Sequence, residues 1–282
     1  MAQDLPQKLQ LSVAGGYQQE DLRWSIAGNA NGQNPNILSE LRWKSIGGPV
    51  TGMHIQFVFF DHWQLEGEYE RMFSSSGKVY DTDYGGNDRT NIVYAAQFHA
   101  GKGGAYRWQA GLANQIPVTN EFSITPSAGY GIFHQSLYIS GNTATFNDLN
   151  STYKTKWTGP YGQVLCSIEL KKKLCINAVL RYSQVRYRAS ANWNLIREFS
   201  HPESFRHTAN GYGITAQASL LYRASGIHAI GIKGSYSRWQ TGRGIDELYL
   251  ATGASEQTQL NEVRSAGWQV MVEWRVSLRP HR

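Results

Sequence analysis

The feature that most constrains the fold is an alternation of side chains in the segment "GWQVMVEWRVSL", residues 267–278. Every second position in it holds an apolar side chain: Trp268, Val270, Val272, Trp274, Val276 and Leu278. Side chains two residues apart lie on the same face of a β-strand, whereas a helix repeats every 3.6 residues. The pattern therefore predicts a strand with one apolar face that is rich in aromatic side chains.

The same period of two recurs in residues 65–69, 176–182 and 214–222. Helical spacing of apolar residues is sparse, and no run of about 18 apolar residues exists that could form a transmembrane helix. Aromatic residues make up 12% of the chain, and it has 29 glycines but only 8 prolines. This composition suits β-structure better than helix, so the sequence predicts an all-β protein.

The connections between the predicted strands alternate in length. Short links fall at residues 61–63, 117–120, 171–173 and 224–227, and long polar segments at 27–36, 84–90, 140–152, 195–204 and 242–259. Four short and five long connections give ten strands, with both ends of the chain on the short-turn side. This layout is typical of an outer-membrane barrel, with short periplasmic turns and long extracellular loops.

The sequence thus predicts one domain, residues 1–282, that forms a ten-stranded antiparallel transmembrane β-barrel in a bacterial outer membrane. Several strands exceed the roughly 9–11 residues that cross a bilayer, so we expect them to protrude as a rim on the extracellular side. A soluble all-β domain is the alternative architecture.

Charged side chains with inward parity gather near the short-turn end: Glu66, Glu68, Glu70, Arg107, Arg181, Arg223, Lys233, Glu273 and Arg275. A ten-stranded barrel is narrow, so these groups are expected to interlock as a salt-bridge plug that allows little or no conduction.

The two cysteines, Cys166 and Cys175, flank the predicted turn at 171–173. Alternation places Cys166 on the apolar face and Cys175 on the polar face, whereas directly opposed residues of paired strands share a face. We therefore expect two free thiols. No metal site is expected, because no further cysteine and no histidine cluster has ligand spacing.

Several segments resemble the omptins, a family of outer-membrane endoproteases on a ten-stranded barrel. The segments "ILSELRWKS" and "QLEGEYERMFSSSGKVYDTDY" are similar to the second and third omptin strands, and "SAGYGIFHQSLY", "YKTKWTGPYG" and "LRYSQVRY" to the fifth, sixth and seventh. The resemblance implies a cleft at the extracellular rim where two aspartates face an Asp-x-His dyad. A water between the two walls would be the nucleophile.

Asp81 and Asp83 match the aspartate pair of this family. The resemblance places the dyad at Asn192 and Asn194, and asparagine cannot take a proton from water. Another reading is that Asp81 and Asp83 are loop acids without a catalytic role, and His201 or His207 could supply a relocated base. Because Asp81 and Asp83 share the parity of Tyr69, a bulge near "SSSG" is needed to turn them into the cleft.

The resemblance also implies lipopolysaccharide binding on the outer barrel wall. The matching positions are Tyr130, His134, Lys156 and Arg206, with lipopolysaccharide as a structural ligand and no other cofactor. Ordinary snorkelling of basic side chains at the membrane interface is the alternative explanation. The net charge of +6 fits both, and nucleic-acid binding is disfavoured because the basic residues are scattered over the strands.

Three functions follow in order of expectation. The first is an omptin-like barrel of the Gram-negative cell surface without proteolytic activity, a pseudoprotease that binds a protein or peptide partner at its cleft or acts structurally. The second is an omptin-type endopeptidase that uses Asp81 and Asp83 with a relocated base. The third is a narrow pore.

Overall fold

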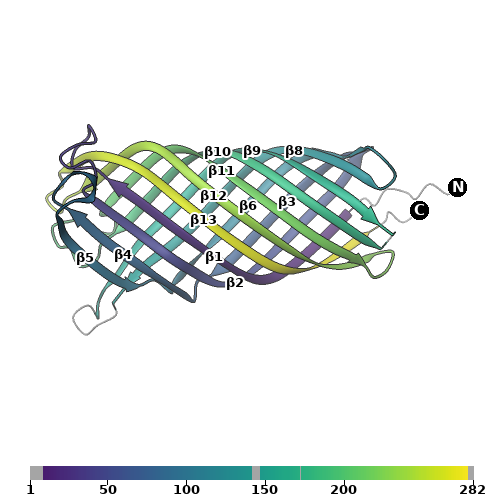
Figure 1. Ribbon diagram of the computed structural model, residues 1–282, viewed down its shortest axis with the longest axis horizontal. Helices are drawn as coiled ribbons and strands as arrows, with labels where there is room; N and C mark the ends of the chain where they lie inside the picture. Colours follow the sequence, from purple (N-terminus) through teal and green to yellow (C-terminus); the bar gives the residue numbers. More distant parts are fainter. Residues whose placement is uncertain (1–8, 142–146, 172, 279–282) are drawn as a thin grey trace.

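The computed structural model describes residues 9–141, 147–171 and 173–278, and this part of the chain is a closed antiparallel β-barrel (Figure 1). Its elements are β1 (Leu9–Ile26), β2 (Ser39–Phe60), β3 (Trp63–Phe73), β4 (Ser76–Tyr84), the 3-10 helix η1 (Asn87–Arg89), β5 (Ile92–His99), β6 (Gly103–Asn114), β7 (Ile116–Pro117), β8 (Phe122–Ser140), β9 (Asn150–Leu170), β10 (Leu174–Asn192), β11 (Phe205–Arg223), β12 (His228–Tyr249) and β13 (Ser255–Leu278). No helix within these residues is long and apolar enough to cross a membrane.

The sheet closes because β1 pairs with β13 on one side and with β2 on the other. The thirteen strands occupy the ten predicted places around the barrel. The third place is divided into β3 and β4, the fourth into β6 and β5, and β7 is a two-residue strand beside the turn that leads into β8. One cause of the second division is Gly103, whose φ of +97° favours glycine, and a Cβ there would lie 2.0 Å from the Ser136 carbonyl oxygen.

The outer wall carries the predicted apolar face. Trp268, Val270, Val272 and Trp274 are 42–57% exposed, while Gln269 and Glu273 between them are buried in the lumen. Exposed aromatic side chains form two bands. The distal girdle, toward the long loops, contains Tyr17, Tyr69, Trp108, Tyr130, Tyr182, Tyr212, Tyr236 and Trp268; the proximal girdle, toward the short turns, contains Phe57, Phe60, Trp63, Tyr222 and Trp274. Such bands lie at the two interfaces of a membrane-spanning barrel.

Strands continue well beyond the distal girdle, as expected for a protruding rim. Figure 1 shows the long loops at one end of the barrel, and β1 begins and β13 ends at the other. The predicted long loop at 242–259 is wrong, because β12 runs to Tyr249 and β13 starts at Ser255. Ile245 pairs with both Thr208 and Gln259, so these residues form a solvated extension of the wall.

The distal half of the lumen is filled by a packed aromatic cluster, defined here as Trp24, Trp43, Tyr153, Trp157, Tyr187 and Phe205, whose members are at most 7% exposed. Trp43 of β2 stacks on Tyr153 of β9 with ring centroids 5.3 Å apart, and Trp157 packs against Tyr187 at 4.3 Å. These rings come from opposite sides of the barrel and occupy its interior.

Ion pairs fill the middle of the lumen. Glu68 lies 3.4 Å from Arg181 and 3.8 Å from Lys233, and Glu70 lies 3.3 Å from Lys233 and 3.8 Å from Arg107. These five side chains form the predicted salt-bridge plug. Two of the expected members lie elsewhere: Arg223 is half exposed and pairs with Glu169, and Arg275 pairs with Glu273.

The cysteines lie as the alternation predicts. Cys166 is paired in register with Ala178, and Cys175 with Glu169, so the two residues are on different rungs of the β9–β10 ladder. Both thiols are free.

Candidate functional site

Asp81 and Asp83 lie on β4, beyond the distal girdle. Asp81 is paired with Leu41 of β2 and Ala96 of β5, and it shares a face with the buried side chain of Val79. The bulge that the sequence requires is present: the strand is interrupted between Phe73 and Ser76, and the β2–β4 register shifts between Lys44 and Gly47. The pair therefore faces the interior, whereas Tyr69 on β3 faces outward.

Burial changes the acidity of both carboxyl groups. It raises the pKa of Asp81 to about 7, and the neighbouring charge of Asp83 adds to the rise. Burial also raises the pKa of Asp83, although a hydrogen bond from Ser39 opposes this. A carboxyl group that titrates near neutral pH could act in acid–base chemistry, provided that a partner group lies within reach.

The residues at the expected dyad positions have other partners. Asn194 Oδ1 accepts hydrogen bonds from the Asn150 backbone N–H at 2.9 Å and from Ser151 Oγ at 3.0 Å, and Asn194 Nδ2 donates to the Asp148 carbonyl at 2.7 Å. Asn194 thus ties the β10–β11 loop to the start of β9. Asn192 Oδ1 lies 2.8 Å from His201 Nδ1.

Neither histidine is placed as a base for Asp81. His201 Nε2 donates to the Ile196 carbonyl at 3.2 Å, so both ring nitrogens have partners within the same loop. His207 is fully buried, with Nδ1 2.7 Å from the Tyr153 hydroxyl and Nε2 3.0 Å from Asp246 Oδ1. The Tyr153 hydroxyl is in turn 2.6 Å from that of Tyr187. The structure brings His207 into a buried Asp–His–Tyr–Tyr network.

The aromatic cluster occupies the space between the two walls. Trp24 packs edge-on against His207 at 5.0 Å and against Phe205 at 5.9 Å, and Trp43 stacks on Tyr153. Trp43 lies beside Leu41, the β2 partner of Asp81. Where a water-filled cleft would separate the Asp pair from a base, this chain places packed rings.

On the outer wall, three predicted positions lie near the distal girdle. Tyr130 is 52% exposed, and His134 and Lys156 are directly paired across β8 and β9. Arg206 is farther around the barrel, on β11, where it makes two hydrogen bonds to the Glu203 carboxylate at 2.8 and 3.1 Å. Its charge is therefore largely compensated, unlike that of Lys156.

Two basic residues that the sequence analysis missed extend this surface. Tyr106 stacks on His134 with centroids 4.9 Å apart, the guanidinium of Arg71 lies 5.8 Å from the Tyr106 ring, and Arg188 is paired with Lys156. We call Arg71, His134, Lys156 and Arg188 the basic row. Arg188 could have been found by counting, because the short β9–β10 turn fixes the register: Leu170 opposes Leu174, so Lys156 must oppose Arg188.

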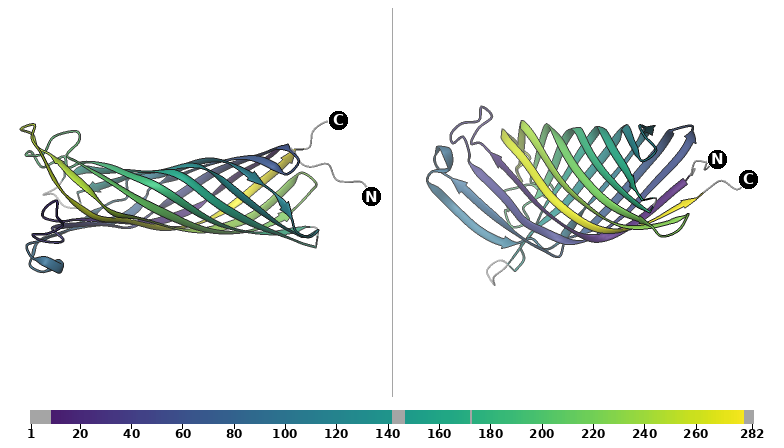
Figure 2. Two further views of the ribbon diagram at one scale, coloured as in Figure 1. Left: turned by 90° about the horizontal axis from the view of Figure 1, so that it is seen from above. Right: turned by 45° about the vertical axis from the view of Figure 1, so that its right-hand side comes forward.

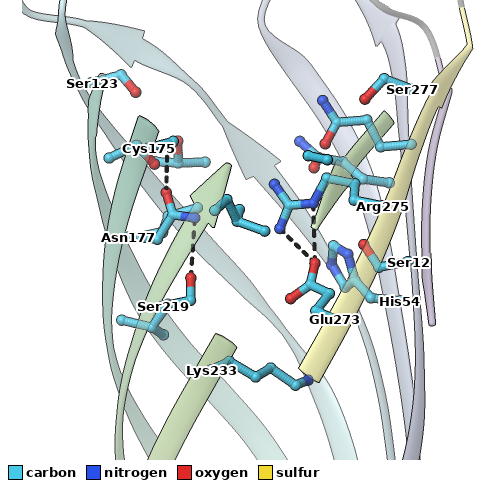
Figure 3. Close-up of a pocket in the computed structure, with 18 of the residues that line it drawn as sticks. Ser12, His54, Ser123, Cys175, Asn177, Ser219, Lys233, Glu273, Arg275 and Ser277 are labelled. Atoms are coloured by element: carbon cyan, nitrogen blue, oxygen red, sulfur yellow. Dashed lines mark hydrogen bonds and ion pairs between the residues drawn. The ribbon is translucent and has the colours of Figure 1, made fainter. Parts of the chain in front are cut away.

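A cavity of about 380 Å³ opens at the short-turn end of the lumen. Figure 3 shows Cys175 donating to Asn177, and Asn177 donating to Ser219, on one side, with Arg275 bound to Glu273 on the facing side and Lys233 at the inner end. The cavity ends at the plug, so it is a closed vestibule of the polar lumen. No group of three or more His, Cys, Asp and Glu in the described ranges is placed to hold a metal ion.

The fold, the two girdles and the polar lumen define an outer-membrane β-barrel protein. Residues 12–277 match the family model "Pom: Protochlamydia outer membrane protein", and the chain belongs to this family. A comparison with curated proteins found no match.

Among solved structures, the chain is similar to the outer membrane protease OmpT from Escherichia coli, with a TM-score of 0.75, 12% identity and 97% coverage of both chains. It also matches the outer membrane protein OprG from Pseudomonas aeruginosa, with a TM-score of 0.39, 12% identity, and coverage of 97% of this chain and 98% of that one. The OmpT match is a likeness of fold, and the OprG match adds no argument. The resemblance to omptins therefore holds for the architecture, and the family and fold place this protein in an outer membrane.

Proposed function

We propose that this protein is a non-proteolytic surface barrel that binds a protein or peptide partner at its long-loop end. The observation that carries the proposal is the aromatic cluster, which fills the space that a nucleophilic water and its base would need. The role of Asn194 as a loop anchor supports the same conclusion, since its amide is held by Asn150, Ser151 and Asp148.

The orientation in the proposal puts the long loops outside the cell. It follows from the general layout of outer-membrane barrels, whose longer connections are extracellular. Protease added to intact cells should then cut in the 193–204 loop and leave the 224–227 turn untouched. The reverse pattern would contradict this orientation.

The experiment that tests the loss of proteolysis is an activity assay on the full chain, refolded in detergent with lipopolysaccharide. Peptides with paired basic residues should remain intact by mass spectrometry, at the rate of a protein-free blank. The second variant, Asn192→Asp with Asn194→His, should also remain inactive, because the rings between the walls stay in place. Cleavage that is abolished by Asp83→Ala would overturn the proposal and establish the endopeptidase alternative.

A second binding role is supported by a separate observation, the basic row. We propose that its cations, together with Tyr130 of the distal girdle, bind the phosphates of lipopolysaccharide on the outer wall. Charged groups at headgroup level attract anionic lipid by about 1 kcal/mol per Lys or Arg, and ammonium and guanidinium groups form charge-assisted hydrogen bonds to phosphate. A ring stack that holds Arg71, Tyr106 and His134 in place reduces the entropy lost on binding.

A further inference from the structure

The strand β5 has an edge that the rest of the barrel leaves uncovered. β5 pairs with β4 along its whole length, but on its other side the described pairing consists of His99 with Ser140 of β8. Residues 92–96, here called the β5 edge, lie beside no other described strand. Figures 1 and 2 show β4 and β5 standing away from the rest of the wall at the long-loop end.

The β5 edge is apolar and uncharged. Ile92 is 61% exposed, Val93 is 63% exposed and Tyr94 is 41% exposed, and neighbouring residues of a strand point to opposite faces. The edge lies beyond the distal girdle, so lipid does not cover it. Proteins normally protect such edges with lysines, prolines or bulges, because a row of open backbone groups is a template for another strand.

We propose that the β5 edge binds an extended segment of a partner protein as an added β-strand, with a basic side chain of that segment directed over Ala96 toward Asp81. This inference deepens the proposed binding function and rests on it. It names the surface that is used and the chemistry of the partner.

The basic side chain follows from the register. Ala96 is paired with Asp81, so a residue placed opposite Ala96 in an added strand would lie about 10 Å from Asp81, two strand spacings away. The small methyl group of Ala96 leaves the path open for a long side chain. Within the described residues, the groups that act on Asp81 and Asp83 include no cation, so a lysine or arginine would supply the missing counter-charge.

A second copy of the chain in the same membrane does not fit this edge. Antiparallel pairing of two identical strands is generated by a two-fold axis perpendicular to the sheet. Such an axis would invert one barrel relative to the other, and two barrels of one membrane have the same orientation. The occupant is therefore a segment of a different protein.

The test uses the refolded full chain and fluorescent peptides of alternating threonine and valine with one central lysine. Matched peptides replace the lysine with norleucine, or carry N-methyl groups on alternate residues along one edge or along the other. Strand addition is driven by main-chain hydrogen bonds and tolerates many sequences, so fluorescence anisotropy should detect binding of the parent peptide. One N-methyl series should lose at least about tenfold in affinity and the other should bind like the parent, because only one peptide edge faces β5.

Two protein variants complete the test. Val93→Lys, which places a charge on the edge, should weaken the lysine peptide about tenfold. Asp81→Asn should bring the preference for lysine over norleucine from about tenfold to about one, while Asp88→Asn, an exposed acid in the adjoining loop, should leave that preference unchanged. Heat-modifiable migration on gels verifies that each variant is folded.

The outcomes separate the two proposals. Equal binding of both N-methyl series, equal affinity for lysine and norleucine, or absence of binding by the parent peptide would overturn the β5 site and leave the proposed function standing. Cleavage of the bound peptide, read by mass spectrometry, would overturn the proposed function and leave the β5 site standing.

Discussion

Trp43 of β2 and Tyr153 of β9 stack across the barrel with an interplanar angle of 15°, and neither side chain is accessible to solvent. The Tyr153 hydroxyl continues into the network with Tyr187 and His207. A pair of rings that spans the lumen in this way both seals the barrel and links the wall beside Asp81 to the opposite wall.

The first prediction concerns this stack. Replacing Trp43 with alanine should lower the free energy of unfolding by about 3–5 kcal/mol, because it leaves a cavity among rigid rings. The measurement is urea unfolding in detergent, followed by the mobility of folded and unfolded barrel on gels. Trp63→Ala is the matched control: Trp63 is 41% exposed in the proximal girdle, so its loss should cost far less in the same assay. Equal costs for both variants would contradict a packed distal lumen.

The wall of the barrel could be predicted because lipid imposes a period of two. The segment 268–278 has one face in hydrocarbon and one in the lumen, so its alternation is read directly from the sequence. Residues 242–259 lack this constraint, since they form a rim surrounded by water on the outside. Their polar composition led to a predicted loop, although they pair as strands.

The aromatic cluster could not be predicted, because strand parity is reversed at irregular points. Trp43 has the same parity as the exposed Met53 on β2, which would assign it to the lipid face. Ser45 has φ of +54°, and the register shifts between Lys44 and Gly47, so the strand turns over and Trp43 points inward. Asp81 and Asp83 turn inward at a similar interruption of the next strand, which the sequence analysis anticipated only because the family resemblance required it.

The second prediction concerns conduction. Two barriers lie in series, the plug around Lys233 and the aromatic cluster beyond it. Planar-bilayer recordings should therefore show no steady current for the wild type. They should also show none for Arg181→Ala combined with Lys233→Ala, because the rings still block the distal lumen. Stepwise currents from the wild-type protein would support the pore alternative.

The third prediction concerns the outer wall. Lys156→Glu and Arg188→Glu should each reduce the stabilisation that added lipopolysaccharide gives to the barrel, by about 1 kcal/mol at low salt. Thermal unfolding with and without lipopolysaccharide measures this difference, and raising the salt should shrink it. Arg206→Gln is the control with a smaller effect, because Glu203 already neutralises Arg206. A uniform loss for all three variants would indicate a general charge effect without a defined site.

The fourth prediction concerns pH. The pKa of Asp81 rises from its ordinary value of 3.8 to about 7 on folding, chiefly through burial, so the folded state binds this proton more tightly than the unfolded state. The contribution of the neutral carboxyl is fully present below pH 3.8 and is lost as the pH rises to about 7, beyond which it changes no further. Asp81→Asn keeps the site neutral at every pH. It should match the wild type near pH 3.5 and exceed it by about 1–2 kcal/mol at pH 8, a figure reduced for screening by water. Urea unfolding of both proteins across this range measures the difference, with Asp88→Asn as the exposed control. A constant difference between pH 3.5 and 8 would show that Asp81 titrates normally and that the face beside Val79 is open to water.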